Sequence, residues 1–294
     1  HHNDSFRIYG GTVEYTGRES LRDCGFNDWY ILVRLYIFRA QRTTGGEELM
    51  TEGVAINIAD VSLDYPVHSK GIGLLREILT GRVKKKSTRL YRALEKISLD
   101  VKKGEVVGLM GANGSGKSTL LRVIAGIYAP DEGSVKVRGR VTLLAGIGTG
   151  FQLDLTGREN IMLTGSIYGY SKMEISNMEE EIIEFSGIGE FIDQPIRTYS
   201  AGMRARLGFA IVSNLEPDIL LLDEVMSVGD TDFRQKSRNK IEQLIKGDAT
   251  VVIVSHSKSI IKSMCDRVFA IEGGKIITDG SIETALEYYE SLGK

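Results

Sequence analysis

The chain has 294 residues, a formal net charge of −2 and 26% charged residues. This length allows one large α/β domain with an appendage, and the near-neutral charge gives no sign of a general nucleic-acid binder. Its two cysteines, Cys24 and Cys265, stand far apart and predict neither a disulfide framework nor a zinc site. No signal peptide is visible and no apolar run reaches the ~18–20 residues of a membrane span, so we expect any membrane role to act through a partner.

The first 49 residues fit poorly with the rest of the chain. His1-His2 looks like the remainder of a purification tag, and the apolar stretch 29–38, which contains the only Trp, fits a strand or a short helix. The sequence from Met50 onward reads like a natural start. We expect 1–49 to be an expression-derived or extra N-terminal segment, with an added domain or arm as the alternative.

Alternating apolar residues predict a strand over 54–63, ended by Tyr65-Pro66. An insertion follows from Lys70 to Leu90 and contains the basic run Lys84-Lys85-Lys86. That run fits a solvated loop, and the alternative is contact with acidic lipid headgroups. The pattern resumes with a second strand predicted over 93–101.

The rest of the chain alternates between strands and helices. Two strands are predicted within 134–144, and the middle of the chain is mostly helical. An α/β pattern then returns, followed by a hairpin around Gly273-Gly274 and a final helix over 282–292. The remaining predictions are helices over 156–168, 172–187, 204–214 and 232–246 and strands over 219–222 and 250–254.

A glycine-rich turn, Gly111 to Ser118, has the spacing G-x-x-x-x-G-K-S between an apolar strand (105–110) and a helix. In this context its backbone N–H groups are expected to enclose a di- or triphosphate, aided by the helix N-terminus. Lys117 is expected to reach the β- and γ-phosphates, and the Ser118 hydroxyl to hold Mg²⁺. The predicted nucleotide contacts here are Gly111, Asn113, Gly114, Ser115, Gly116, Lys117, Ser118 and Thr119.

Polar residues follow the next two apolar strands. Asp223 and Glu224 follow the run 219–222, where parallel sheets bind ligands. We therefore expect Asp223 to orient Mg²⁺, usually through water, and Glu224 to act on the attacking water as general base or polariser. His256 follows the strand 250–254 and is expected to contact the γ-phosphate.

A second anion site is predicted at Ser200 and Gly202, which begin the helix over 204–214. A simple helix cap is the alternative, because Ser is a favoured capping residue. The phosphate loop already supplies one helix N-terminus for the nucleotide. A second such site therefore suggests that it serves the ATP of another subunit.

From Met50 to Lys294 the chain resembles the nucleotide-binding subunit of an ABC transporter. The resemblance rests on motifs that occur in the family's order. The sequences of 155–160, 198–203 and 224–230 look like those of the branch that exports polysaccharides. It implies an α/β fold of the P-loop NTPase, ABC type, with a mixed sheet, an antiparallel β portion and a helical subdomain over about 152–215. The motifs are the phosphate loop, Ser200-Ala201-Gly202-Met203, Asp223-Glu224, Ser227-Val228-Gly229-Asp230 and His256.

The resemblance also implies partners and further site residues. Two copies are expected to bind two ATP molecules head to tail, each under Ser200 and Gly202 of the other copy, with Asp230 touching the opposite site. A dimeric membrane permease would couple to this motion at the cytoplasmic face of the inner membrane, which makes the subunit peripheral. Tyr65 matches the family's adenine-stacking aromatic, and Tyr91 competes for that role. The usual Mg²⁺-binding Gln is missing near 143–146, so Gln152 either takes that role or the role is altered.

The cargo remains open between a lipid-linked polysaccharide, such as O-antigen, capsule or teichoic acid, and a lipid or drug. Only 106 residues separate Lys117 from Asp223, which excludes the DNA-repair ATPases that place a long coiled coil between these motifs. A single cassette argues against the ribosome-acting class, which carries two. An intact Glu224 and His256 argue against a non-hydrolysing binding module.

Overall fold

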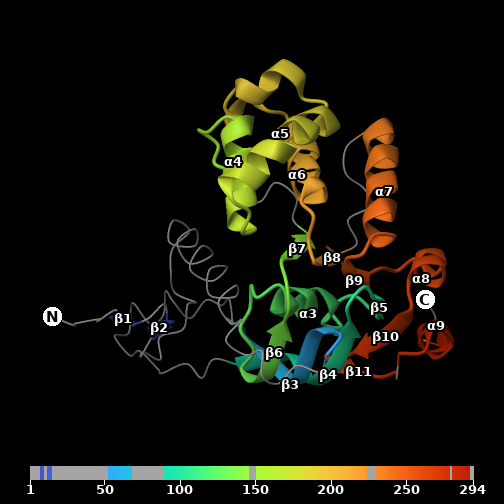
Figure 1. Cartoon of the computed structure of the whole chain (residues 1–294). Helices are drawn as coiled ribbons and strands as arrows, with labels where there is room; N and C mark the ends of the chain where they lie inside the picture. The colour runs from blue at the N-terminus through green and yellow to red at the C-terminus, as the bar shows by residue number, and fades with distance from the viewer. Residues whose placement is uncertain are drawn as a thin grey trace, which may run out of the picture.

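The computed structural model describes residues 7–9, 12–14, 52–67, 89–145, 150–223, 230–278 and 280–291. Within the first 49 residues, β1 (Arg7–Tyr9) and β2 (Thr12–Glu14) pair antiparallel. The predictions for the apolar stretch 29–38, the basic run 84–86 and Glu224 lie outside these ranges. The remaining elements form a sheet-containing lobe and, above it in Figure 1, a helical lobe.

A six-stranded sheet of order β11-β10-β5-β9-β8-β7 forms the centre of the sheet-containing lobe. Its strands are parallel except for the antiparallel edge pair β10–β11. The strands β5 and β9 are buried along their whole length, which is why they read as continuous apolar runs. The bounds are β5 (Val106–Met110), β7 (Val141–Leu144), β8 (Ile219–Asp223), β9 (Thr250–Val254), β10 (Arg267–Glu272) and β11 (Lys275–Ile276).

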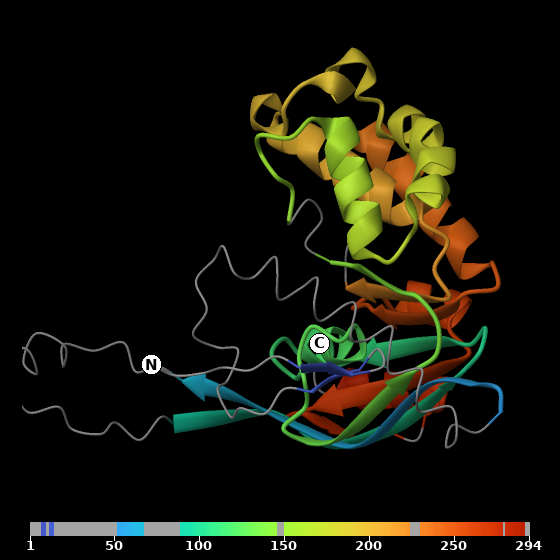
Figure 2. The same ribbon diagram turned by 60° about the vertical axis from the view of Figure 1, so that its left-hand side comes forward.

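A three-stranded antiparallel sheet consists of β4 (Arg89–Lys102), β3 (Val54–Val67) and β6 (Glu132–Val137), in the order β4-β3-β6. The prediction that Tyr65-Pro66 ends the first strand is wrong, because β3 continues to Val67 and Pro66 lies opposite Leu90. The β6 pairing reaches only Ser62, so beyond it β3 is an edge, where Pro costs no ladder hydrogen bond. Leu90, predicted to lie in the insertion, belongs to β4, and Figure 2 shows both long strands projecting from the body.

Helices cover both faces of the six-stranded sheet. The helix α3 (Lys117–Ile124) lies between the two sheets, and its buried residues share one core with β3, β4 and β5. The helices α7 (Thr231–Ile245), α8 (Lys258–Met264) and α9 (Ile282–Ser291) contribute to a second core with the other face. We did not predict α8 from the sequence, because seven residues are too few for a clear helical period. In the described ranges, no helix has the length and apolar character needed to cross a bilayer.

The helical lobe contains α4 (Gly157–Ile167), α5 (Lys172–Ser186), α6 (Ala201–Asn214) and two short 3₁₀ helices, η2 (Gly189–Asp193) and η3 (Ile196–Thr198). It has its own core, which Ile161, Ile175 and Leu207 share. Both α4 and α5 begin with a capping box, in which Thr156 pairs with Glu159 and Ser171 with Glu174. These local signals explain why both helix starts could be predicted from the sequence.

Three phenylalanines join the helical lobe to α7. Phe209 on α6 is fully buried, stacks on Phe185 at 6.0 Å between ring centroids and meets Phe233 edge-on at 5.8 Å. We expect Phe209→Leu to lower the free energy of unfolding by about 1–2 kcal/mol, because it loses both aromatic pairs while keeping most of the apolar volume. Thermal unfolding measures this, with the exposed Phe191→Leu as control. Equal melting temperatures for the two variants would contradict it.

Candidate nucleotide-binding site

The phosphate loop joins β5 to α3 and is braced by neighbouring backbone. Gly116 has φ of 111°, and a Cβ there would lie 2.8 Å from the carbonyl oxygen of Ala93 on β4, so only glycine fits. The Gly274 N–H donates to the Ser115 carbonyl at 2.9 Å, and the Glu95 N–H donates to the Gly274 carbonyl at 2.9 Å. The predicted hairpin around Gly273-Gly274 thus connects the loop to β4 and fixes its shape.

Charged and polar side chains meet where this loop ends. Lys117 is 6% exposed, and its Nζ donates to the carbonyl oxygens of Gly111 and Ala112, each at 2.8 Å. The Ser118 hydroxyl donates to Asp223 Oδ1 at 3.0 Å. The start of α3 and the carboxyl end of β8, which lie 105 residues apart in the chain, therefore meet at one point.

A cavity of about 230 Å³ lies over this point. It brings together most of the residues predicted to bind nucleotide, together with Ala93 and Val254, which carry no sequence signal. The predicted residues that line it are Tyr65, Tyr91, Asn113, Gly114, Gly116, Lys117, Ser118, Thr119, Asp223 and His256.

The donor set of this cavity fits a magnesium ion. The described residues contain no cluster of three or more His, Cys, Asp or Glu side chains. Mg²⁺ needs no such cluster, because it keeps several waters and usually takes one or two protein ligands plus phosphate oxygens. The adjacent Ser118 hydroxyl and Asp223 carboxylate supply that minimal set.

Two tyrosines line the cavity. Tyr65 and Tyr91 are cross-strand partners on β3 and β4. Tyr65 packs edge-on against Tyr128 at 5.7 Å, and its hydroxyl donates to Thr119 at 3.5 Å, while burial raises the pKa of Tyr65. Tyr91 is 52% exposed. Both remain predicted adenine contacts, and Tyr91 has the more accessible ring.

His256 lies just beyond β9 and contributes to the same cavity. Its Nδ1 is 2.9 Å from the hydroxyl of Tyr289 on α9. Sequence reasoning missed Tyr289, because the motif Leu286-Glu287-Tyr288-Tyr289 has two adjacent tyrosines and no local signal for which one contacts His256. Only the packing of α9 on the sheet decides this.

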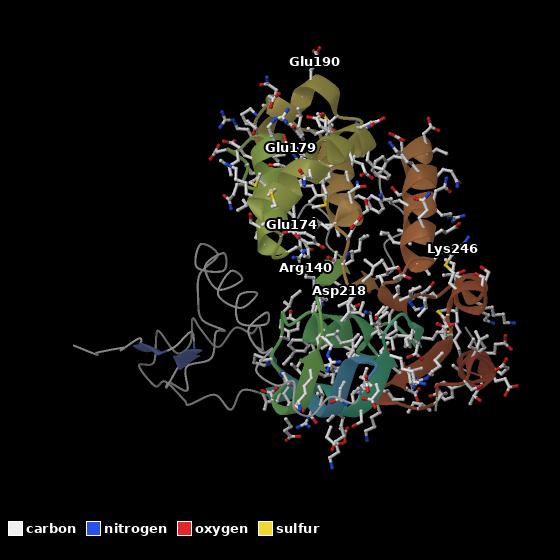
Figure 3. The ribbon with its side chains drawn as sticks, viewed as in Figure 1. Arg140, Glu174, Glu179, Glu190, Asp218 and Lys246 are labelled. Atoms are coloured by element: carbon white, nitrogen blue, oxygen red, sulfur yellow. The ribbon has the colours of Figure 1, made fainter. Side chains whose placement is uncertain are left out.

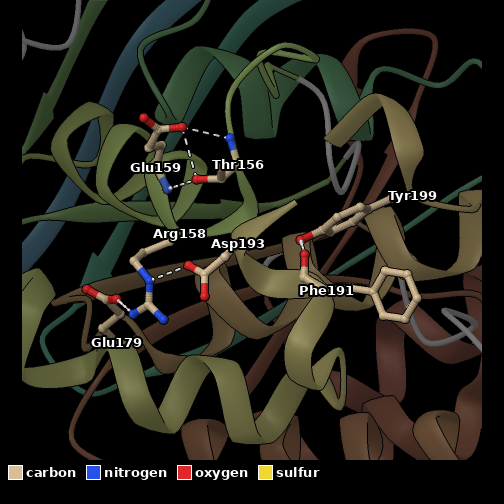
Figure 4. A network of polar contacts seen from close by, with 7 residues as sticks. All are labelled: Thr156, Arg158, Glu159, Glu179, Phe191, Asp193 and Tyr199. Atoms are coloured by element: carbon tan, nitrogen blue, oxygen red, sulfur yellow. Dashed lines mark hydrogen bonds and ion pairs between the residues drawn. The ribbon is translucent and has the colours of Figure 1, made fainter. Parts of the chain in front are cut away.

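Ser200 and Gly202 lie in the helical lobe and do not line the cavity of their own chain. Ser200 caps α6 by accepting a hydrogen bond from the Met203 N–H at 3.1 Å, and both Ser200 and Gly202 are exposed. The preceding residue, Tyr199, is buried, and its hydroxyl donates to the Phe191 carbonyl at 2.6 Å (Figure 4). Tyr199 therefore holds the start of α6 against the lobe, while Ser200 and Gly202 remain exposed to solvent.

An ion-pair network stiffens the lobe around this segment. Arg158 on α4 donates to Asp193 Oδ1 at 2.9 Å and also to Glu179 on α5 (Figure 4). These two carboxylates raise the pKa of Arg158. One guanidinium therefore joins three elements of the lobe, α4, α5 and η2.

Asp230 and Gln152 are predicted site residues that do not line the cavity. Asp230 caps α7 by accepting from the Phe233 N–H at 2.9 Å, and this hydrogen bond lowers its pKa. The backbone of Gln152 is held by the buried side chain of Asn160, which accepts from its N–H at 2.8 Å and donates to its carbonyl at 3.1 Å. Gln152 does not line the cavity, so its metal role stays a prediction.

The junction between the lobes lies at the other end of β8. Figure 3 shows Arg140 between Glu174 and Asp218. The Arg140 N–H donates to Asp218 Oδ2 at 2.7 Å, and its guanidinium donates to Glu174 Oε1 at 2.8 Å. Hydrogen bonds from Ser171 and Arg140 lower the pKa of Glu174 to about 2. The contact between Arg140 and Asp218 lies at the amino end of β8, and the nucleotide cavity lies at the carboxyl end of the same strand.

The mixed sheet, the antiparallel sheet, the helical lobe and the phosphate loop together define a nucleotide-binding domain of the ATP-binding cassette type. Two solved structures share the fold. One is an ATP-binding subunit of an ABC transporter, with a TM-score of 0.61 and 19% identity, covering 82% of this chain and 95% of that one. The other is a dimeric ATP-binding cassette bound to ADP and phosphate, with a TM-score of 0.58 and 21% identity, covering 77% and 98%.

Sequence relatives give the family. The ABC transporter family model matches residues 94–227. The O-antigen export system ATP-binding protein RfbB of Klebsiella pneumoniae is 44% identical over 80% of this chain and 97% of its own length. The teichoic acids export ATP-binding protein TagH of Staphylococcus haemolyticus is 38% identical over 82% and 90%. The chain therefore belongs to the ABC transporter family as an ATPase subunit, which confirms the resemblance and the fold class.

Proposed function

We propose that this chain hydrolyses ATP to drive export of a lipid-linked polysaccharide through a separate membrane permease. The proposed cargo rests on the 44% identity to an O-antigen export ATP-binding protein over nearly the whole length of that protein. The second relative, from teichoic acid export, shares the cargo class of a surface polymer. The alternative is an exporter subunit for a lipid or drug.

In this proposal the cavity binds the nucleotide through its triphosphate. The phosphate-loop amides and Lys117 hold the phosphates, and Tyr65 or Tyr91 stacks on adenine. Mg²⁺, held by Ser118 and Asp223, neutralises phosphate charge when bound. Glu224 accepts a proton from the attacking water while the bond from the γ-phosphorus to the leaving oxygen breaks. His256 donates a hydrogen bond to the γ-phosphate.

We further propose that two copies complete each site head to tail. Ser200 and Gly202 are exposed at an α6 N-terminus and do not line their own chain's cavity, which suits contact with a nucleotide on a second copy. Asp230 of each copy touches the opposite site. ATP binding closes the pair and hydrolysis opens it. A permease dimer couples to this opening and closing. Because the subunit binds that permease, it lies peripherally at the cytoplasmic face of the inner membrane.

Stimulation of ATP hydrolysis by cargo tests the proposal. The chain is reconstituted in proteoliposomes with its permease, and ATPase rates are measured with lipid-linked polysaccharide, a phospholipid or a hydrophobic drug. We expect several-fold stimulation by the polysaccharide alone. Stimulation only by the phospholipid or the drug would contradict a polysaccharide cargo and favour the alternative. Lys117→Ala serves as the inactive control.

A further inference from the structure

The contact between His256 and Tyr289 connects the nucleotide cavity to α9. The distance from Nδ1 to the hydroxyl oxygen is 2.9 Å, and the ring centroids are 6.2 Å apart at an interplanar angle of 43°. The rings are therefore not stacked, and they meet through their polar edges. His256 lines the cavity, whereas Tyr289 is buried in the second core, between α9 and the six-stranded sheet.

Packing fixes the position of this hydroxyl. Tyr289 is 6% exposed, and Ala285 and Leu286, one helical turn earlier, lie in the same core. A second contact joins α9 to the same segment, because Lys258 Nζ donates to Glu290 Oε1 at 2.9 Å. Neighbouring residues of α9 thus contact two points of the segment 256–258.

The chemistry of imidazole gives this contact a consequence. A neutral ring has one donor and one acceptor nitrogen, and the partner of Nδ1 determines which is which. Phosphate oxygens accept hydrogen bonds, so a histidine that contacts them needs an N–H on the nitrogen that faces them. A phenol hydroxyl that donates to Nδ1 leaves the proton on Nε2.

We propose that Tyr289 is a positioning residue that donates to Nδ1, holds His256 in the Nε2–H tautomer and so presents Nε2–H to the triphosphate. This inference rests on the proposed contact of His256 with the γ-phosphate. It assigns a role in ATP hydrolysis to α9, which contributes no residue to the cavity lining.

The chain offers a matched control on the same helix. The hydroxyl of Tyr288 donates to the Glu272 carboxylate on β10, which raises the pKa of Tyr288. Tyr288→Phe therefore removes a bonded hydroxyl from α9 without touching His256. Tyr289→Phe removes the other and keeps the buried ring.

Steady-state kinetics of the two variants give the first test. We expect Tyr289→Phe to lower kcat for ATP hydrolysis about tenfold with KM for ATP unchanged, because partners that orient ligating histidines typically contribute 10–100-fold and a small misplacement of a site group has a comparable cost. Tyr288→Phe should keep the wild-type kcat. Melting temperatures within a few degrees of each other show that both variants fold. A wild-type kcat for Tyr289→Phe would overturn the proposal.

The tautomer itself is measured by NMR of protein labelled with ¹⁵N-histidine at alkaline pH, where imidazoles are neutral. The chain has four histidines, so His256→Ala assigns the signal. We expect wild-type His256 to be protonated on Nε2, and Tyr289→Phe to shift both nitrogens towards a tautomer mixture. Protonation of Nδ1 in the wild type, or unchanged shifts in Tyr289→Phe, would overturn the proposal. Because this measurement needs no turnover, it decides the inference even if the proposed function fails.

Discussion

Lys117→Ala is expected to weaken ATP binding by at least about 100-fold, because hydrogen bonds to a charged group contribute about 1.5–3 kcal/mol each and the ammonium makes more than one to the phosphates. The ammonium is already desolvated, since Lys117 is 6% exposed and its Nζ contacts the Gly111 and Ala112 carbonyls at 2.8 Å. A triphosphate on the loop adds anionic oxygens to a cation that is held in place. Titration with a fluorescent ATP analogue measures the affinity.

A lysine close to the loop but outside the cavity provides the control. Lys275 on β11 is 54% exposed and pairs with Glu95 at 3.2 Å, beside the hairpin that braces the loop. Lys275→Ala should keep the wild-type affinity, since an exposed ion pair contributes little. Thermal unfolding shows whether Lys117→Ala is folded. If the folded variant bound ATP about as well as Lys275→Ala does, the assignment of Lys117 to the phosphates would be wrong.

The parts of the site that could be predicted from the sequence are those with local signals. The phosphate loop needs glycine where a Cβ would collide with Ala93, and Asp223 ends a strand that is buried by its neighbours. The capping boxes at Thr156 and Ser171 fixed two helix starts in the same way. In each case the residue type and its spacing carry the physical constraint.

The parts that could not be predicted depend on packing between distant segments. The sequence prediction ends β3 too early. Pro66 can lie within β3 only because β6, which pairs along the other side of β3, ends before it, and the sequence near Pro66 does not indicate this. Tyr289 meets His256 only through the docking of α9, 33 residues later in the chain. Gln152 does not line the cavity, and the side chain of Asn160 binds its backbone, so its metal role stays a prediction.

Glu224→Gln is expected to lower ATP hydrolysis about 10³-fold while ATP still binds, because a positioned general base typically contributes 10²–10⁴-fold. Glu224 itself lies outside the described residues, and its assignment rests on its place after Asp223, whose carboxylate accepts from the Ser118 hydroxyl at 3.0 Å. The amide keeps the size of the side chain and loses the proton acceptor. Phosphate release by the purified variant measures the effect, and near-wild-type turnover would refute the assignment of the base.

The same variant reports on the proposed pair of sites, because ATP that is bound and not hydrolysed keeps the pair closed. We expect Glu224→Gln to elute as a dimer with ATP and as a monomer without it in size-exclusion chromatography with light scattering. Adding Ser200→Arg should abolish that dimer and leave ATP binding to each chain intact, because Ser200 is exposed at the start of α6 and outside its own cavity. A dimer that survives Ser200→Arg would show that the helical lobe of one copy does not cover the nucleotide of the other.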